Sequence, residues 1–216
     1  MFTDFILVRH GETSYNKEGI LQGWTDVPLN ETGKKQAEKT AEILKKESFD
    51  EVWFSDLQRA ADTASAILKY HPGVPAYPNP SIREWHLGIL ENKPYEMLRQ
   101  EFSDYAKMLR TELVEMPVPG GESRGDFQKR INNAFQDLAE RSPGKRCLIV
   151  THGGVLVRLF RMLGGEIPRS GTIPVPGNAS VSRIRYDHDA KQWIFLEWNQ
   201  VYSDVQDHFL SDAPPL

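Results

Sequence analysis

Three short apolar segments, each followed by a turn and a helical pattern, constrain the fold of this chain more than any other feature. The segments are Phe5-Ile6-Leu7-Val8, Cys147-Leu148-Ile149-Val150 and a predicted second strand, Glu51-Val52-Trp53-Phe54, which is apolar after its first residue. Runs of this length are typical of strands buried on both faces, and strands that alternate with helices form a parallel sheet covered by helices. The pattern predicts a three-layer α/β/α domain with a mostly parallel central sheet and a site at the carboxyl ends of its strands.

The spacing of small and apolar residues predicts helices between these strands. Asn30 is a good N-cap, and Ser55 with Gln58 has the spacing of a capping box. The predicted elements are helices over 31–46, from about Asp56, from Ser123, and from His152 to Gly164-Gly165, followed by a hairpin over 181–186 and 193–198.

Residues 91–116 combine helical character with aromatic and methionine side chains interleaved with charges. Such a segment, inserted between the second and third apolar strands, is expected to form a helical lid. A length of 216 residues, at about 150 residues per domain, predicts one domain or one domain with an insertion. We therefore expect a single domain over residues 1–216, with the lid inserted at about 85–121.

Composition excludes several classes of protein. Lysine and arginine number 26 against 30 acidic residues, and no long basic run suggests binding to nucleic acid. Arg158 and Arg161 interrupt the longest apolar stretch, and Asp4 and Arg9 interrupt the N-terminal one, so neither a membrane span nor a signal peptide is expected. The single cysteine, Cys147, lies in an apolar run and predicts a buried thiol and a cytoplasmic protein.

A pair of basic residues, Arg9 and His10, lies where the first strand should end. Burying an arginine beside a histidine is costly unless an anion meets both side chains. Arg59 is expected in the first turn of its helix, where the helix dipole disfavours a cation by about 0.3–1 kcal/mol unless an anion binds there. These positions predict an anion-binding site.

A second histidine, His152, ends its own apolar strand and precedes Gly153 and a further glycine, which permit the backbone to approach a ligand closely. Asn16 adds a neutral donor in the first loop. Two guanidinium groups, two imidazoles and an amide suit a tetrahedral dianion, since arginine binds its oxygens in pairs and histidine can donate or attack. The six histidines include no His-Glu-x-x-His motif, so no metal site is expected.

Four ordered motifs give the chain a specific resemblance. They are residues 7–16 (LVRHGETSYN), 22–29 (QGWTDVPL), 55–60 (SDLQRA) and 150–154 (VTHGG). Together they resemble the histidine phosphatase superfamily, in its phosphoglycerate mutase-like branch. The resemblance runs in order from residue 5 to about residue 185, and it implies a phosphoglycerate mutase-like fold.

The resemblance implies that His10 attacks phosphorus, becomes phosphorylated and is then released by water. This agrees with the chemistry of a neutral imidazole, which is nucleophilic when a hydrogen bond, here to a backbone carbonyl near Gly11, fixes its other nitrogen. Arg9, Arg59 and His152, with Asn16, would stabilise the phosphoryl oxygens. Such a mechanism requires neither a metal nor a cofactor.

The resemblance also places Glu84 as the general acid that protonates the leaving group and later as the base for water. A carboxyl group beside bound phosphate should have a raised pKa, because like charge disfavours its ionisation. Gln22 and Gly23 match a family loop over the phosphate, and Gly153 is a further expected contact. Residues 88–92 (GILEN) depart from the Gly-x-Trp-Glu-Gly of many phosphatase members, which clouds the substrate, and the roles of His86 and Glu122 stay open.

Three functions are compatible with these residues. The first is a metal-independent phosphomonoesterase acting on a small phosphorylated metabolite. The second is a cofactor-dependent phosphoglycerate mutase, and the short segment between Arg59 and residues 82–84, with its compact and partly apolar lid, favours the phosphatase over it. The third is a phosphate-binding regulatory module without catalysis, which should lack a reacting group. The substrate and a homodimer through the C-terminal strands stay open.

Overall fold

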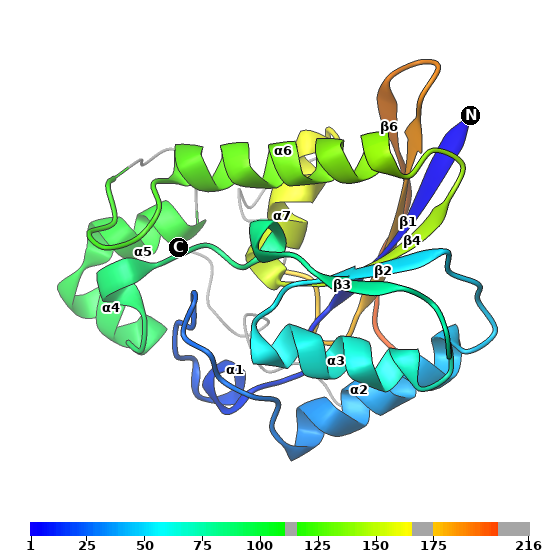
Figure 1. Ribbon diagram of the computed structural model, residues 1–216. Helices are drawn as coiled ribbons and strands as arrows, with labels where there is room; N and C mark the ends of the chain where they lie inside the picture. Colours follow the sequence, from blue (N-terminus) through cyan, green and yellow to red (C-terminus); the bar gives the residue numbers. More distant parts are fainter. Residues whose placement is uncertain (111–115, 166–174, 203–216) are drawn as a thin grey trace.

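The computed structural model describes residues 1–110, 116–165 and 175–202 and contains a six-stranded sheet (Figure 1). The order of strands across the sheet is β3-β2-β4-β1-β5-β6. Their bounds are β1 Phe2–Arg9, β2 Glu51–Phe54, β3 Ala76–Pro78, β4 Arg146–Thr151, β5 Val181–Asp187 and β6 Gln192–Gln200.

Four neighbouring strands run parallel, because β1 pairs with β4, β4 with β2, and β2 with β3 in the same direction. The hairpin β5–β6 adds two antiparallel strands beside β1. The predicted mostly parallel sheet and its closing hairpin are confirmed. Because parallel strands share a direction, the carboxyl ends of β1, β4 and β2 meet at one edge of the sheet.

The period-2 alternation of the central strands divides their side chains between two apolar cores. Phe5 and Leu7 of β1 belong to one core cluster, whereas Ile6 and Val8 belong to the other. All four are at most 1% exposed. A strand with both faces covered must be apolar at every position, which explains the uninterrupted run in the sequence.

Helices cover both faces of the sheet, as Figure 1 shows, with α6 and α7 on one side and α2 and α3 on the other. This confirms the three-layer architecture. The helices are α1 Ser14–Glu18, α2 Glu31–Leu44, α3 Gln58–Leu68, α4 Tyr95–Glu101, α5 Ser103–Arg110, α6 Arg124–Arg141 and α7 Gly153–Met162, with two short 3₁₀ helices, η1 Pro80–Ile82 and η2 Gly88–Leu90.

Two of the three predicted helix caps are present. Asn30 accepts a hydrogen bond from Gly33 N at 2.7 Å, and Ser123 accepts one from Asp126 N at 3.1 Å. The capping box at Ser55 is wrong, because α3 begins later, with Leu57 as its N-cap and no side-chain cap. The Ser55 hydroxyl contacts His152 on β4's carboxyl side instead, so a tertiary contact replaces the local one.

The lid consists of α4 and α5, which lie beside the main body and pack against each other (Figure 1). Leu98 and Met108 are fully buried there and join the core cluster under α6. Part of the predicted lid, residues 111–115, lies outside the described residues.

Besides the 3₁₀ helices η1 and η2, two short elements were not predicted. The strand β3 lies in the Pro-rich stretch, where the sequence indicated only the end of a helix, and it pairs with β2 over three residues. The helix α1 occupies the first loop, with Thr13 as its N-cap. Both elements are too short for a periodic pattern to reveal them.

Two further observations concern the single cysteine and the apolar content of the helices. Cys147 is buried in β4, and burial raises the pKa of its thiol to about 12. Within the described ranges, no helix has both the length and the apolar content that crossing a membrane requires.

Candidate active site

The ends of three parallel strands bring the predicted histidines and arginines together. Arg9 is the last residue of β1, and His10 N donates to Thr151 O at the end of β4 at 2.9 Å. Ser55 N, after β2, donates to Val150 O at 3.0 Å, and the chain then enters α3 with Arg59. The sequence separates these residues widely, and the sheet topology alone makes them neighbours.

A cavity of about 210 Å³ opens at this edge of the sheet. The ring of His152 does not line it but lies against the ring of His10, with centroids 5.2 Å apart. The other eight residues predicted for the site all line the cavity: Arg9, His10, Asn16, Gln22, Gly23, Arg59, Glu84 and Gly153.

The ring of His10 is held in one protonation state and one orientation. Its Nδ1 lies 2.7 Å from the carbonyl oxygen of Gly11, which can only accept, so Nδ1 carries the proton. Burial, followed by the nearby charges of Arg59 and Arg9, lowers the pKa of His10 well below its ordinary value. His10 is therefore neutral near pH 7, and its Nε2 holds an unprotonated lone pair.

Two buried guanidinium groups make the cavity electropositive. Arg59 is fully buried and donates to Thr25 O at 2.9 Å and to Gly23 O at 2.7 Å, while its Nε has no partner among the described residues. Burial lowers the pKa of Arg59 to about 10, which leaves it protonated at neutral pH. Arg9 donates to Pro176 O at 2.6 Å. Backbone carbonyl oxygens thus hold the guanidinium groups of both arginines in place.

Glu84 lies across the N-terminus of α7. Its two carboxylate oxygens accept hydrogen bonds from Trp85 N and Gly154 N, each at 2.9 Å. A Cβ atom on residue 154 would lie 2.1 Å from Glu84 Oε1, so only glycine lets the carboxylate approach this helix so closely. Glu84 lies two residues after the 3₁₀ helix η1.

A hydrogen-bond network in the first loop orients two amides. Thr13 caps α1, and its hydroxyl contacts Asn16 Oδ1 at 3.1 Å and Gln22 Oε1 at 3.0 Å. Asn178 Nδ2 also donates to Asn16 Oδ1, at 3.3 Å, and to His10 O, at 3.0 Å. Because the amide oxygens of Asn16 and Gln22 accept these bonds, their amide nitrogens are the groups left to donate to an anion in the cavity.

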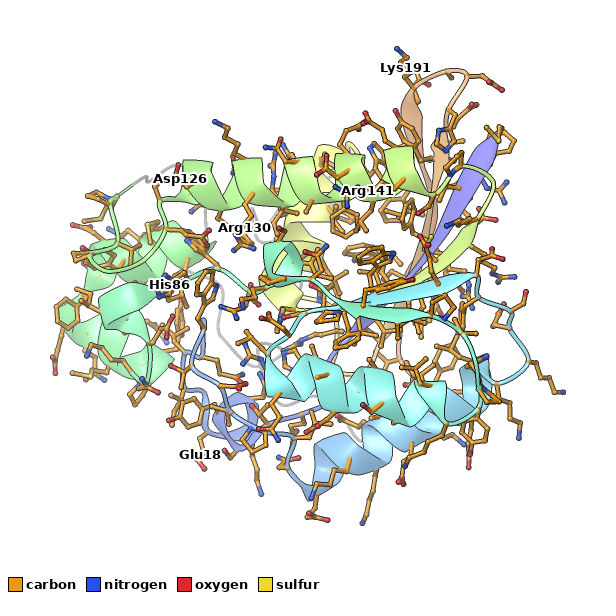
Figure 2. All side chains as sticks on the ribbon, viewed as in Figure 1. Glu18, His86, Asp126, Arg130, Arg141 and Lys191 are labelled. Carbon is orange, nitrogen blue, oxygen red and sulfur yellow. The ribbon has the colours of Figure 1, made fainter. Side chains whose placement is uncertain are left out.

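Arg130 of α6, labelled in Figure 2, holds the segment that carries Glu84 through hydrogen bonds. Its guanidinium donates to the backbone oxygens of Ser81, Arg83 and Glu84 at 2.9–3.0 Å. It also forms two 2.7 Å hydrogen bonds with the carboxylate of Glu122. Glu122, whose role the sequence left open, is therefore the ion-pair partner of Arg130.

Trp24 holds the same segment through a second hydrogen bond to Glu84 O. Its Nε1 donates to Glu84 O at 2.7 Å, and its ring stacks on His86, with centroids 4.4 Å apart. His86, whose role the sequence left open, therefore packs on Trp24 and does not line the cavity. Glu91 fixes the backbone of Trp24 by accepting from Trp24 N at 2.9 Å.

Sequence reasoning missed Asn178 and Arg130 as parts of the site. Arg130 lies on the polar face of an amphipathic helix, where an arginine is ordinarily solvated, and nothing local marks its partners. Asn178 lies in a turn, where asparagine is ordinary. Their involvement depends on contacts across 46 and 168 positions of sequence, which no local pattern encodes.

The buried histidines predict how stability depends on pH. Burial lowers the pKa of His10 and of His152 well below the ordinary value, so on unfolding both bind protons that the folded state excludes. Above about pH 6.5 the two histidines therefore do not reduce the free energy of unfolding. As pH falls below this value, the free energy of unfolding decreases by about 1.4 kcal/mol per pH unit for each histidine. Urea unfolding between pH 7 and 5, in buffer free of phosphate, measures this slope.

The variant His10→Asn isolates one of these terms. We expect its free energy of unfolding to fall less steeply below pH 6.5 than that of the wild type, because one fewer proton is taken up. His188→Asn, outside the cavity, is the matched control. Equal slopes for the wild type and His10→Asn would show that His10 is not held neutral by burial.

Comparison with known proteins places this geometry in a family. The model of the histidine phosphatase superfamily, branch 1, matches residues 5–201. A metal-independent phosphoserine phosphatase from Arabidopsis thaliana is 35% identical over 223 residues, covering 99% of this chain and 90% of the relative. Phosphoglycerate mutase-like protein 4 from the same plant is 32% identical over 214 residues, covering 98% and 91%.

Solved structures agree with the sequence relatives. The structure of Bacillus stearothermophilus YhfR superposes with a TM-score of 0.83 at 30% identity, covering 93% of this chain and 98% of that one. The residues that the family model matches, 5–201, include every residue that lines the cavity. This chain belongs to branch 1 of the histidine phosphatase superfamily, as its four ordered motifs predicted.

Proposed function

We propose that this protein is a metal-independent phosphomonoesterase that acts on a small phosphorylated metabolite through a phosphohistidine at His10. The observation that carries the proposal is the tautomer of His10. Its proton is held at Nδ1 by Gly11 O, so the Nε2 lone pair faces a cavity with two guanidinium groups and a carboxylate. Family membership supports phosphoryl transfer as the class of reaction.

In the first step, Nε2 of His10 attacks phosphorus in line, and the bond from phosphorus to the ester oxygen breaks. Protonated Glu84 gives its proton to that oxygen, and the alcohol leaves. In the second step, the Glu84 carboxylate removes a proton from water, whose oxygen attacks phosphorus and displaces Nε2. Inorganic phosphate leaves, and both residues return to their starting states.

The remaining residues stabilise charge on the phosphoryl oxygens. Arg9 and Arg59 supply two fixed cations for a dianion, and the amide nitrogens of Asn16 and Gln22 supply neutral donors. The backbone of Gly23 and Gly153 allows close approach at the rim of the cavity. A Cβ atom on residue 153 would lie 2.6 Å from the Val175 side chain, so a larger residue here would force that side chain to move.

The size of the cavity supports a small substrate. Its volume of about 210 Å³ lies below the roughly 300–1,000 Å³ typical of pockets for drug-sized ligands. Its cations also favour hydrolysis over the mutase reaction. Among the described lining residues, Arg9 and Arg59 are the cationic ones, and two cations suit one dianion better than the two of a bisphosphate intermediate.

One assay separates hydrolase from mutase. The protein is incubated with 3-phosphoglycerate and a bisphosphoglycerate primer, and in parallel with p-nitrophenyl phosphate with and without EDTA. We expect release of inorganic phosphate from p-nitrophenyl phosphate that survives chelation. Efficient formation of 2-phosphoglycerate without phosphate release would establish a mutase instead, and activity lost to EDTA would overturn the metal-independent mechanism.

A further inference from the structure

The cavity has a cationic end and an apolar wall, formed by different parts of the chain. The cationic end lies at the ends of β1 and β4 and the start of α3. The wall comes from the first loop, the segment after Glu84 and the lid helices, and its members include Leu21, Trp85, Leu87, Tyr95 and Leu109.

The apolar wall is built into the fold. Leu21 N donates to Lys93 O at 2.9 Å, and Tyr95 N donates to Gly19 O at 2.8 Å, so the first loop is joined to the start of α4. Trp85 stacks on Phe127 of α6 with ring planes 2° apart. The residues of this wall belong to, or pack on, the core cluster under α6, and they present an apolar surface before any substrate binds.

The geometry of attack directs the leaving group toward this wall. In-line displacement places the departing oxygen opposite His10 Nε2 and within reach of Glu84. The rest of the alcohol must extend past Glu84, and the next cavity-lining residues along the chain are Trp85 and Leu87. The leaving group therefore meets the apolar wall, while phosphate meets the arginines.

Charge excludes a second anion from this end of the cavity. The described cations that line it, Arg9 and Arg59, both lie at the phosphate end. A carboxylate on the leaving group would be desolvated against apolar side chains, without a cationic partner and near Glu84. Burying an unpaired charge costs several kcal/mol.

We propose that the substrates are phosphomonoesters of apolar alcohols, with an aromatic or branched alkyl group and no second anionic group. This inference rests on the proposed phosphatase function and deepens it. The apolar wall contributes affinity through burial of the alcohol, and the absence of cations among its described residues discriminates against phosphoamino acids and phosphoglycerates.

A matched set of esters tests the substrate class. The compounds 2-phenylethyl phosphate, O-phospho-L-serine and 3-phosphoglycerate are all esters of primary alcohols, so the wall and not the leaving group should set their order. We expect kcat/KM for 2-phenylethyl phosphate to exceed that of the other two by about 100-fold or more. Equal or reversed values would overturn the substrate class.

Substitutions at Leu109 of α5 test the wall itself. Leu109→Ala should lower kcat/KM for 2-phenylethyl phosphate about 10-fold and leave that for phosphoserine unchanged. Leu109→Arg should raise the value for phosphoserine by supplying a cation. Ile89→Ala is the control, because Ile89 is 48% exposed and does not line the cavity. Equal effects of Leu109→Ala on both esters would contradict the inference.

Failure of the substrate class is distinguishable from failure of the proposed function. If phosphate is released from all three esters at similar rates, the phosphatase stands and the substrate class is wrong. If no ester is hydrolysed and no phosphoenzyme forms, the proposed function itself is wrong, and this inference falls with it.

A second, independent observation concerns a buried serine. Ser55 and His152 are both fully buried, and Ser55 Oγ lies 2.7 Å from His152 Nε2. Leu57 N donates to the same hydroxyl oxygen at 3.4 Å. Among the described residues, His152 Nε2 is therefore the acceptor that remains for the hydroxyl proton.

This proton count fixes the tautomer of His152. Burial, followed by the charge of Arg59, lowers the pKa of His152 well below its ordinary value, so the ring is neutral and carries one proton. If Nε2 accepts from Ser55, that proton is on Nδ1. Nδ1 is buried and has no hydrogen-bond partner in the described part of the chain, and the ring lies beside His10.

We infer that Ser55 is a positioning residue that holds His152 with its proton on Nδ1, so that Nδ1 donates to an oxygen of the phosphoryl group on His10. The inference rests on the proposed phosphohistidine for its role in catalysis. The tautomer itself is a property of the free protein and is measured without substrate.

Nitrogen NMR of the histidine rings tests this assignment. We expect the wild type to have His152 protonated at Nδ1, and Ser55→Ala to lose that single tautomer and about 10–100-fold in kcat/KM. Ser182→Ala, at a buried serine of β5 away from the cavity, should change neither. A proton on Nε2 in the wild type, or an unchanged tautomer in Ser55→Ala, would overturn the inference.

Discussion

Replacing His10 with alanine is expected to lower kcat/KM for phosphate release by about 10⁴–10⁶-fold, because the variant has no nucleophile to accept the phosphoryl group. Arg9, Arg59 and Glu84 would remain, so inorganic phosphate or vanadate should still bind. Steady-state rates with p-nitrophenyl phosphate, combined with a binding measurement, separate lost chemistry from lost affinity.

A control is needed because His10 is itself buried. His71→Gln replaces another buried histidine, which packs on Phe49 and does not line the cavity. If this variant folds, it should keep nearly full activity. Circular dichroism establishes folding for both variants. A His10→Ala protein that is folded, binds vanadate and retains more than about a tenth of the activity would exclude His10 as the nucleophile.

Replacing Glu84 with glutamine is expected to affect esters according to their leaving group. An alkyl phosphate needs a proton on its departing oxygen, so its kcat/KM should fall by about 10²–10⁴-fold. With p-nitrophenyl phosphate the loss in kcat/KM should be below about 10-fold, because nitrophenolate leaves without a proton. kcat/KM is the quantity to compare, since it reflects formation of the phosphoenzyme and not its hydrolysis.

Glu96→Gln provides the matched control, because Glu96 is an exposed acid on α4 that pairs with Arg99. It should leave both substrates unaffected. Equal losses with both esters in Glu84→Gln would indicate that Glu84 positions the site and does not donate the proton. The main role of the Glu84 side chain would then be its hydrogen bond with Gly154 N at the start of α7, and not proton transfer to the substrate.

The fold could be predicted because its central strands are buried on both faces. The covered positions of such strands are apolar, so β1 and β4 each contain a short apolar run in the sequence, and β2 has Val52, Trp53 and Phe54 after Glu51. The helices between them bury one face, which leaves a periodic pattern. The residues that end these strands could be predicted as a site, because parallel strands carry their carboxyl ends to the same edge.

What could not be predicted depends on contacts between distant residues. Ser55 has the local spacing of a helix cap, yet its hydroxyl bonds to His152, which is 97 positions away. Here a tertiary hydrogen bond in the closed interior replaces a local one at a helix end. The strand β3 forms because β2 has an open edge beside it, although its own three residues carry no strand pattern.

The residues that support the site also could not be predicted, because they act through contacts with distant parts of the chain. Arg130 donates to three backbone carbonyls of the Glu84 segment, and Trp24 also donates to Glu84 O. Acceptors of this kind are backbone atoms, which every residue has, so the sequence gives no sign of them. The reacting groups themselves are rarer residue types in unusual places, and these the sequence does mark.

The central claim, that His10 transiently carries the phosphoryl group, is tested most directly by trapping the intermediate. The protein is mixed with p-nitrophenyl phosphate, quenched within a turnover in alkaline denaturant, digested and examined by mass spectrometry. We predict one added phosphoryl group on the peptide that contains His10, lost on brief acid treatment and absent from His10→Ala. Phosphate release without any such adduct, or an adduct on a different residue, would contradict the account.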